Sequence, residues 1–420
     1  MRRSIPIVAA VLGLGLTLTA CSGDGSSNET TSKAPEPTTT TSEAPKLSGE
    51  LTFWVDEERI KDFPNVAEAF EAEFGVKVNL VQKANGDLKT DFLAQVPTGK
   101  GPDLVIGAHD WVGEFVANGV AAPVQLGDAQ SGLSGGSITA FSADGQLYGV
   151  PYAVENIALI RNNELVKETP ATFDELIAQN DTTKAKYPVV VQQGKDGDAY
   201  HLNPLMTSFG ISILATDATG AYQGEAGTAG DGGAAWAEWL AAQGEAGWLS
   251  PDIDGQIAAD AFKNGETPYI ITGPWNVTGG EGRFEEEGMD VSVLPIPSAG
   301  GETSKPFAGY QGIYVSAEST NKVAANAFVS YIARGDVQAE LYKDGGRIPV
   351  ASDAAAAVDN ELLKGFALAG QDAVPAPSLK EMDSIWSNWG KTQVQIISGK
   401  ATDPAGAWTE LTNQINDLFK

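Results

Sequence analysis

Short apolar runs alternate along the chain with segments in which an apolar residue recurs every three or four positions. Residues 51–55 predict a strand, and residues 64–74 predict a helix with Val66, Phe70 and Phe74 on one face. The same order recurs at residues 76–81, 87–96, 103–107 and 110–119, where Asp87 and Asp110 are expected to cap the two helices. Strands that alternate with helices predict βαβ crossovers and a mostly parallel sheet.

The second half of the chain shows the same two periods. Residues 267–272 and 291–295 predict strands, whereas residues 234–242 and 322–333 predict helices. No unit of 20 to 50 residues recurs, so a solenoid or propeller is not indicated. Both halves are therefore predicted to be α/β.

The first twenty residues have the pattern of a secretory signal. Arg2 and Arg3 precede an apolar run over residues 5–18, which is shorter than the roughly 20 residues of a membrane-spanning helix. Leu18-Thr19-Ala20-Cys21 resembles the bacterial lipobox, which implies cleavage before Cys21 and a diacylglycerol on its thiol. A lone buried cysteine is the alternative. We expect a signal peptide at 1–20 and a lipid anchor on the outer face of the bacterial cytoplasmic membrane.

Residues 21–49 differ in composition from the rest of the chain. After Cys21 they are mainly Ser, Thr, Pro, Glu and Gly, with almost no large apolar side chain. Such a segment cannot bury enough surface to fold, so it is predicted to be a disordered tether.

Charge and composition narrow the classes of function. Lys and Arg number 27 against 55 Asp and Glu, a net charge of -28, which disfavours binding to nucleic acid phosphates. One Cys and two His exclude a disulfide framework and a structural zinc site. We expect no metal and no cofactor.

The ends of the predicted strands carry side chains suited to a sugar. Ligands of open α/β sheets bind beyond the carboxyl ends of strands, where Asp56, Glu58 and Arg59 follow the first strand and Asp110 follows the third. A sugar ring can lie on an indole while its hydroxyls pair with carboxylates and guanidinium groups. Plain core packing is the alternative for each tryptophan considered. These tryptophans are Trp54, Trp111, Trp275, Trp386 and Trp389.

Enzymatic motifs are weak. Gly132-Leu133-Ser134-Gly135-Gly136 matches a nucleophile elbow in letters but lies in a Gly/Ser-rich stretch. His109 and His201 lack the spacing of metal ligands, and no phosphate-binding loop occurs. A glycoside hydrolase stays open, because its test is the separation of two carboxylates, about 5 Å or about 6.5 to 9.5 Å.

Several segments, in family order, resemble the solute-binding lipoproteins of ABC importers, specifically the maltose and maltodextrin-binding proteins. They are residues 51–55, 101–110, 151–155, 262–275, 294–295 and 304–307. The resemblance implies a bilobal, periplasmic-binding-protein-like (type II) fold, with two α/β lobes around a hinged cleft. The implied N-terminal lobe is residues 50–154 and 309–353, and the C-terminal lobe is residues 158–306 and 358–420.

The resemblance also implies roles for single residues. Asp56, Glu58 and Arg59 match polar sugar-contacting positions, and Asp110 and Glu155 match carboxylates that bind glucose hydroxyls. The aromatic platforms match Tyr200, Trp275 and Trp386. Four positions depart from the family pattern. This chain has Gly107 where the pattern has a Trp, and Trp111 where it has an Arg. It has Ser387 in place of an aromatic residue and Gly390 in place of an Arg. The indole of Trp111 is a candidate to compensate for Gly107.

The resemblance implies an extracytoplasmic receptor that captures maltose, a maltooligosaccharide or a related α-glucoside by hinge closure. Its expected partners are ABC permease subunits and the membrane, through the lipid on Cys21. We expect a monomer without enzymatic activity and without nucleic acid. A glycoside hydrolase and a cell-surface lectin are the alternative functions.

Overall fold

The computed structural model describes residues 47–217, 221–280 and 282–420. They belong to one compact unit, Ala44–Lys420. The predicted signal peptide, Cys21 and nearly all of the predicted tether lie outside the described residues.

The larger sheet contains the first three predicted strands. Its order is β14-β6-β13-β3-β1-β2, and β15 pairs with β13 outside this path. β1 is parallel to β2 and β3, as predicted, whereas β13 is antiparallel to β3 and β6. The strands are β1 (Glu50–Asp56), β2 (Lys77–Lys83), β3 (Leu104–Ala108), β6 (Gly149–Glu155), β13 (Phe307–Val315), β14 (Ile348–Pro349) and β15 (Val374–Pro375).

Amphipathic helices pack on this sheet and form the first core. Phe53 of β1, Phe70 of the first helix and Phe328 of a helix far along the chain are fully buried against one another, with ring centroids 5.1–5.8 Å apart. We call the part built on the larger sheet the first lobe. Its helices are α1 (Pro64–Phe74), α2 (Asn85–Gln95), α3 (Val112–Ala117), α4 (Gly135–Ala140), α10 (Lys322–Ile332), α11 (Gly335–Gly345) and α12 (Ser352–Ala356).

The smaller sheet has the order β12-β7-β11-β8 and organises the second lobe. β7 (Ala158–Asn162) is antiparallel to both β11 (Tyr269–Thr272) and β12 (Val291–Leu294), and β11 is parallel to β8 (Val190–Val191). The mostly parallel sheet predicted from residues 51–119 was confirmed for β1, β2 and β3 but wrong for the rest of the larger sheet, and the smaller sheet is mixed as well. The helices are α5 (Phe173–Thr183), α6 (Ala199–Thr207), α7 (Gly230–Glu245), α8 (Gly255–Lys263), α9 (Pro274–Val277), α13 (Glu361–Ala369), α14 (Met382–Ile397) and α15 (Pro404–Asp417).

Short elements complete the two lobes. The small strand pairs are β4 (Ser142–Ala143) with β5 (Gln146–Leu147) and β9 (Leu214–Thr216) with β10 (Tyr222–Ala226). The 3-10 helices are η1 (Ile60–Asp62), η2 (Val96–Thr98), η3 (His109–Trp111) and η4 (Gly127–Gly132).

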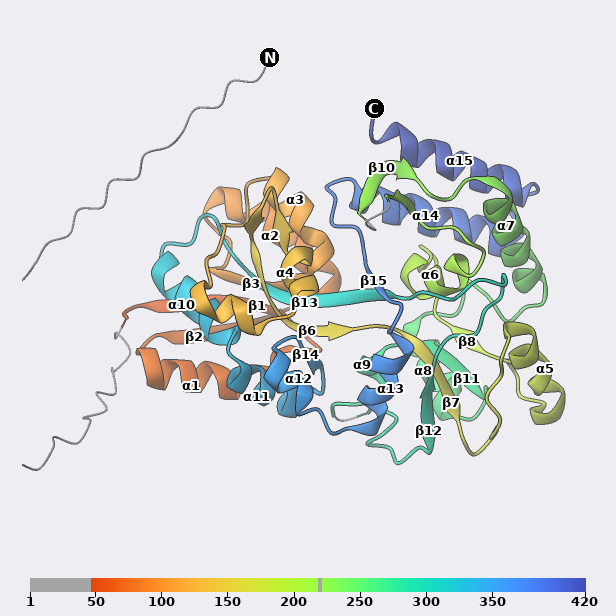
Figure 1. The fold of residues 1–420 in the computed structure, drawn as a ribbon, viewed down its shortest axis with the longest axis horizontal. Coiled ribbons are helices and arrows are strands. Elements are labelled where there is room, and N and C mark those ends of the chain that lie inside the picture. Colours follow the sequence, from red (N-terminus) through yellow and green to blue (C-terminus); the bar gives the residue numbers. More distant parts are fainter. Residues whose placement is uncertain (1–46, 218–220, 281) are drawn as a thin grey trace, which may run out of the picture. The chain divides into compact units, whose positions relative to one another are not determined.

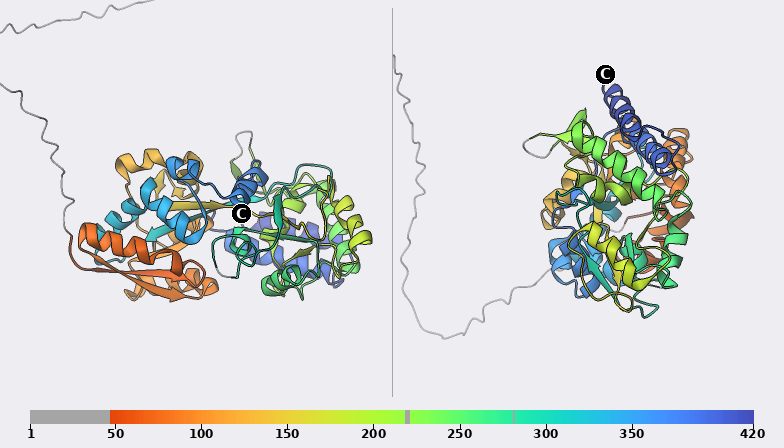
Figure 2. Two further views of the ribbon diagram at one scale, coloured as in Figure 1. Left: turned by 90° about the horizontal axis from the view of Figure 1, so that it is seen from below. Right: turned by 90° about the vertical axis from the view of Figure 1, so that its right-hand side faces the viewer.

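The chain passes between the lobes more than once. Figure 1 shows the antiparallel strands β6 and β13 extending side by side between the larger sheet and the smaller one. Figure 2 shows α15, in dark blue, ending at the C-terminus on the surface of the second lobe. The α/β, two-lobed fold class predicted from the sequence is confirmed, whereas the predicted lobe boundaries stay a prediction.

Two predicted helix caps were wrong. The helix expected to begin after Asp87 begins at Asn85, with Ala84 as N-cap, so Asp87 lies inside its first turn. Asp110 lies in η3, and α3 begins at Val112 after it. In both places the chain turns earlier than the local pattern indicates, and Asp110 is left free to face another part of the molecule.

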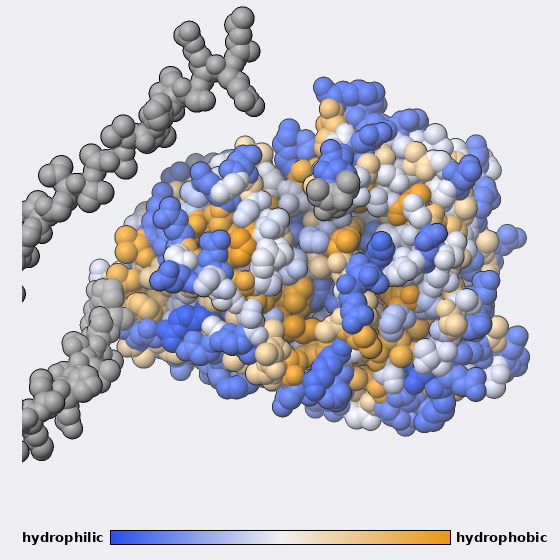
Figure 3. Space-filling model, viewed as in Figure 1, coloured by the Kyte–Doolittle hydropathy of each residue, from blue (hydrophilic) through white to orange (hydrophobic). Residues whose placement is uncertain are grey.

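Hydrophilic and hydrophobic residues are interspersed on the face seen in Figure 3, with hydrophobic patches near its centre. Of the helices that the structure describes, none has both the length and the apolar character needed to cross a bilayer.

Gln338 is a buried polar link whose loss we expect to destabilise the first lobe. It is 1% exposed; its Nε2 donates to the carbonyls of Pro151 and Ile332, and its Oε1 accepts from the amides of Val350 and Ala351. Gln338→Ala should lower the free energy of unfolding by about 3 kcal/mol, because buried groups lose their partners.

Urea denaturation followed by circular dichroism measures this change. Gln414→Ala, on the exposed face of α15, is the control and should stay within about 0.5 kcal/mol of the parent. Equal stabilities for the two variants would contradict the prediction.

Candidate functional site

A cavity of about 500 Å³ lies between the two lobes and is lined by every residue predicted to contact the sugar. Its volume falls within the range typical of small-molecule sites, about 300 to 1,000 Å³. The predicted residues that line it are Asp56, Glu58, Arg59, Asp110, Trp111, Glu155, Tyr200, Trp275 and Trp386. Side chains from six separate segments of the chain thus meet in one place.

Strand ends explain this convergence. Asp56 is the last residue of β1, and Asp110 follows the end of β3, which is parallel to β1. Glu155 is the last residue of β6, and Trp275 follows β11 of the second lobe. The carboxyl ends of these strands face the cavity, as expected for α/β sheets.

The aromatic side chains form much of the wall on the second lobe. Trp386 stacks on Trp389 with ring centroids 5.3 Å apart and an interplanar angle of 6°. Trp389 is fully buried, so plain core packing holds for it, as it does for Trp54. The indole nitrogen of Trp386 donates to Asp110 Oδ2 at 3.3 Å, and thereby joins the two lobes. Only some of the tryptophans considered therefore face the cavity.

Two indoles of the wall lie directly against glycines. A methyl group at Gly107 would collide with the ring of Trp111, and one at Gly273 would collide with the ring of Trp275. The missing side chain at Gly107 thus leaves the space that the Trp111 ring occupies. This geometry is consistent with compensation of Gly107 by Trp111.

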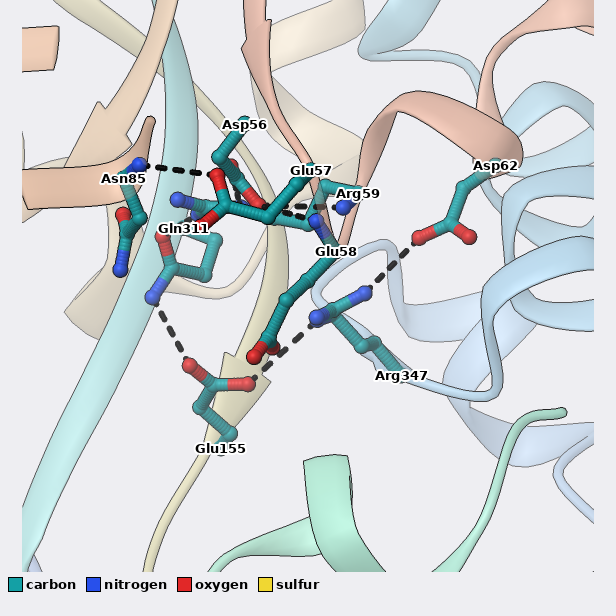
Figure 4. Close-up of polar contacts among 9 residues, drawn as sticks. All are labelled: Asp56, Glu57, Glu58, Arg59, Asp62, Asn85, Glu155, Gln311 and Arg347. Atoms are coloured by element: carbon teal, nitrogen blue, oxygen red, sulfur yellow. Dashed lines mark hydrogen bonds and ion pairs between the residues drawn. The ribbon is translucent and has the colours of Figure 1, made fainter. Parts of the chain in front are cut away.

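The wall on the first lobe is a chain of buried polar contacts (Figure 4). Asp56 accepts from the amides of Glu58 and Arg59 at 3.0 Å each and from Arg59 Nε at 2.5 Å. Arg59 also donates to Gln311, whose Nε2 donates to Glu155 Oε1 at 2.8 Å. Asp56 is thus largely engaged within its own loop, and Glu155 stands at the end of the chain of contacts.

Tyr200 and His201 bring hydrogen-bonding groups to the opposite wall. Burial, together with nearby Glu155, Asp198 and Asp110, raises the pKa of Tyr200 above its usual value, so its phenol stays protonated. His201 Nδ1 lies 2.8 Å from Asp198 Oδ2, while its Nε2 has no hydrogen-bond partner within the described part of the chain. The site therefore contains groups that suit hydroxyls.

Sequence reasoning missed six polar residues of the wall. Gln311 is brought in by the pairing of β13 with β3 and β6, and Arg347 directly precedes β14, which pairs with β6, so no local signal marks either residue. His109 directly precedes Asp110 and His201 directly follows Tyr200, which were the available hints. The missed residues are Asn85, His109, Gln192, His201, Gln311 and Arg347.

The stretch around Ser134 does not have the geometry of a nucleophile elbow. Ser134 is preceded by η4 rather than by a strand, and its Oγ accepts from the amide of Ser137 as an N-cap of α4. A nucleophile elbow requires a strand before the serine. Within the described residues, no group of His, Cys, Asp and Glu side chains could hold a metal ion.

Known proteins share this architecture. The maltotriose-binding protein of Thermus thermophilus, solved with maltotriose, superimposes with a TM-score of 0.78 at 27% identity, covering 88% of this chain and all of that one. The fold and the position of the cavity therefore define a bilobal binding protein.

Sequence comparison gives the family. Residues 65–365 match the model of the bacterial extracellular solute-binding proteins, and this chain belongs to that family. It is 30% identical to a maltotriose-binding protein of Pyrococcus abyssi, over 82% of this chain and 77% of that one. A galactooligosaccharide-binding protein of Bacillus subtilis is 26% identical, over 85% and 86%. A maltooligosaccharide ABC transporter solute-binding lipoprotein of Streptococcus pneumoniae is 26% identical, over 90% and 92%.

Asp198 is expected to stabilise the second lobe through its charge. It caps α6, accepting from the amide of His201 at 2.9 Å, and also accepts from Gln192. Burial acts to raise the pKa of Asp198, but His201 and these hydrogen bonds lower it overall. A lowered pKa stabilises the fold above the unfolded value, so Asp198→Asn should lose about 2 kcal/mol near neutral pH and less in acid.

Thermal unfolding between about pH 3 and pH 7 checks this. Asp254→Asn is a matched control, because Asp254 caps α8 through the same 2.9 Å contact but is exposed. A loss for Asp198→Asn that does not depend on pH would contradict the electrostatic explanation.

Proposed function

We propose that this protein is the extracytoplasmic sugar-binding component of an ABC importer and that its ligand is an α-linked gluco-oligosaccharide such as maltose or maltotriose. The observation that carries the proposal is the convergence of indole rings and carboxylates from both lobes on one cavity. The relatives named above support it, since they bind maltotriose, maltooligosaccharides or galactooligosaccharides.

The chemistry of the wall suits a pyranose. The CH faces of the rings pack on the indoles of Trp111, Trp275 and Trp386, and the hydroxyls pair with Asp110 and Glu155. A micromolar ligand needs about 8 kcal/mol, and hydrogen bonds to charged groups contribute about 1.5 to 3 kcal/mol each. Three or four such bonds together with stacked rings are therefore sufficient.

Transport follows from closure. Sugar that contacts both walls stabilises the conformation in which the lobes close around it. Closure changes the outer surface that a permease contacts, so the membrane subunits distinguish the loaded receptor from the empty one. The receptor binds the sugar and releases it unchanged, in keeping with relatives that are solute-binding proteins.

The anchor belongs to the same proposal. A lipid on Cys21 would hold the protein at the outer face of the membrane as a monomer, and the relative of Streptococcus pneumoniae is a lipoprotein. The composition of residues 21–49 predicts a tether, and about 27 residues of such a chain would span roughly 25 to 30 Å on average. The body would then lie close enough to the membrane to meet its permease.

Isothermal titration tests the ligand. Maltotriose should bind with a Kd of about 1 μM or tighter, whereas a galactooligosaccharide should bind at least about tenfold more weakly. Maltose, trehalose and sucrose complete the series. Binding to none of the glucosides would contradict the proposal, and glucose released from maltotriose would show a hydrolase instead.

The aromatic platform gives a residue-level prediction. Trp386→Ala should weaken maltotriose binding by about 2 kcal/mol, about thirtyfold, because a central ring is lost. Trp239→Ala is the control: Trp239 stacks on Trp236 with the same 5.3 Å separation but lies outside the cavity. It should lower thermal stability and leave the affinity unchanged; equal affinities in both variants would place Trp386 outside the site.

A further inference from the structure

Asp62 is a buried carboxylate that the proposed function leaves unexplained. It is the last residue of η1, is 1% exposed and does not line the cavity. Its Oδ2 accepts from Arg347 Nη1 at 2.8 Å, while its Oδ1 has no hydrogen-bond partner among the described residues. A buried ion pair is a poor source of stability, because desolvation offsets much of the attraction. Asp62 therefore calls for another role.

Arg347 connects Asp62 to the cavity. Figure 4 shows its guanidinium between the carboxylates of Asp62 and Glu155. The two contacts are unequal: 2.8 Å to Asp62, but 3.5 Å from Nε to Glu155 Oε2. At the longer distance Oε2 of Glu155 accepts no hydrogen bond within the described part of the chain. Asp62 thus holds the cation at ion-pair distance from Glu155, a residue that lines the cavity, without a hydrogen bond to its buried Oε2.

The backbone around this pair is built for the contact. Arg347 follows Gly345 and Gly346 at the end of α11, and a methyl group at Gly345 would collide with the carboxylate of Asp62. Gly346 has a φ of 68°, in the left-handed region that glycine tolerates best. The turn therefore presents Arg347 in a single position between the two acids.

We propose that Asp62 and Arg347 are positioning residues for Glu155, and that protonation of Asp62 in mild acid weakens ligand binding. The proposal rests on the function proposed above. With Asp62 neutral, Arg347 moves onto Glu155, hydrogen-bonds its Oε2 and neutralises the carboxylate that lines the cavity. No bond of the ligand is changed.

Asp62 is expected to change its protonation state within a pH range in which binding can be measured. Burial raises the pKa of Asp62 to about 6, and Asp56 acts in the same direction. Arg347, Lys61 and Arg59 oppose the shift. Tyr152 of β6 and Arg283, beyond α9, also face this group. Loss of the proton above about pH 6 is what places the charge opposite Arg347.

Protonation of Asp62 is expected to raise the stability of the fold and to lower the affinity for the ligand. Because its pKa is raised on folding, Asp62 takes up a proton on folding between its unfolded value, near 4, and about 6. Its contribution to stability is present below that range and is lost as the pH rises through about 6. Acidification therefore stabilises the fold through this group while it weakens binding, whereas a purely structural role would move both together.

Titration of maltotriose between about pH 5 and pH 7.5 tests the proposal in the wild type, Asp62→Asn and Asp336→Asn. Wild-type affinity should fall about tenfold with a midpoint near pH 6, and Asp62→Asn should be weak and independent of pH. Asp336→Asn removes an exposed carboxylate that pairs with Arg334, and should follow the wild type. If Asp62→Asn does not fold, the same titration of Arg347→Met tests the pair, because this variant lacks the cation that would move onto Glu155, so its affinity should not depend on pH.

The outcomes are distinguishable. A wild type that binds maltotriose with the same pH profile as Asp62→Asn would overturn this inference alone. A wild type that binds none of the sugars would overturn the proposed function and the inference with it. The double variant Asp62→Asn, Arg347→Met should bind more tightly than Asp62→Asn alone, because no cation is left to move onto Glu155; a double variant as weak as Asp62→Asn would overturn the pairing.

Discussion

The pairing of β13 with both β3 and β6 is the constraint on which the rest of the structure depends. In this register Gly309 lies opposite Glu155, and Gln311 lies opposite both Ala108 and Ala153. A strand from late in the chain is thereby inserted between two early ones, and their carboxyl ends open on the same space. Gln311 can then bridge Arg59 and Glu155. A slip of one residue would turn its side chain to the other face of the sheet, because side chains alternate along a strand.

The charges in this wall are paired unequally. Asp56 and Asp62 each engage an arginine at short range, whereas Arg347 Nε lies 3.5 Å from Glu155 Oε2 without a hydrogen bond to it. Pairing every acid closely with its nearest cation would be simpler electrostatically, but it would neutralise Glu155, which lines the cavity. Asp62 and Glu155 each keep one oxygen that accepts no hydrogen bond from the described residues, which is consistent with a binding wall rather than with a core optimised for stability.

Local patterns predicted much of this site because its residues follow strand ends. Asp56, Asp110, Glu155 and Trp275 were located from apolar runs and from family resemblance, and membership of the solute-binding family is confirmed. Gln311 and Arg347 could not be found in this way, since their roles arise from contacts between distant segments. The caps assigned to Asp87 and Asp110 failed because η3 and the earlier start of α2 depend on tertiary packing. Trp386 and Trp389 also show what a local pattern cannot predict. They lie three positions apart on one helix, but Trp386 lines the cavity and Trp389 is fully buried.

The departures from the family pattern bear on which sugar fits. Gly107 has no side chain, and the ring of Trp111 occupies the space against it. Position 111 therefore contributes an indole to the cavity and no cation. Next to it, Asp110 contributes a carboxylate, which accepts from the indole nitrogen of Trp386. A ligand that contacts Asp110 must share that carboxylate with a ring of the opposite lobe, so sugar binding and the approach of the lobes are coupled through one side chain.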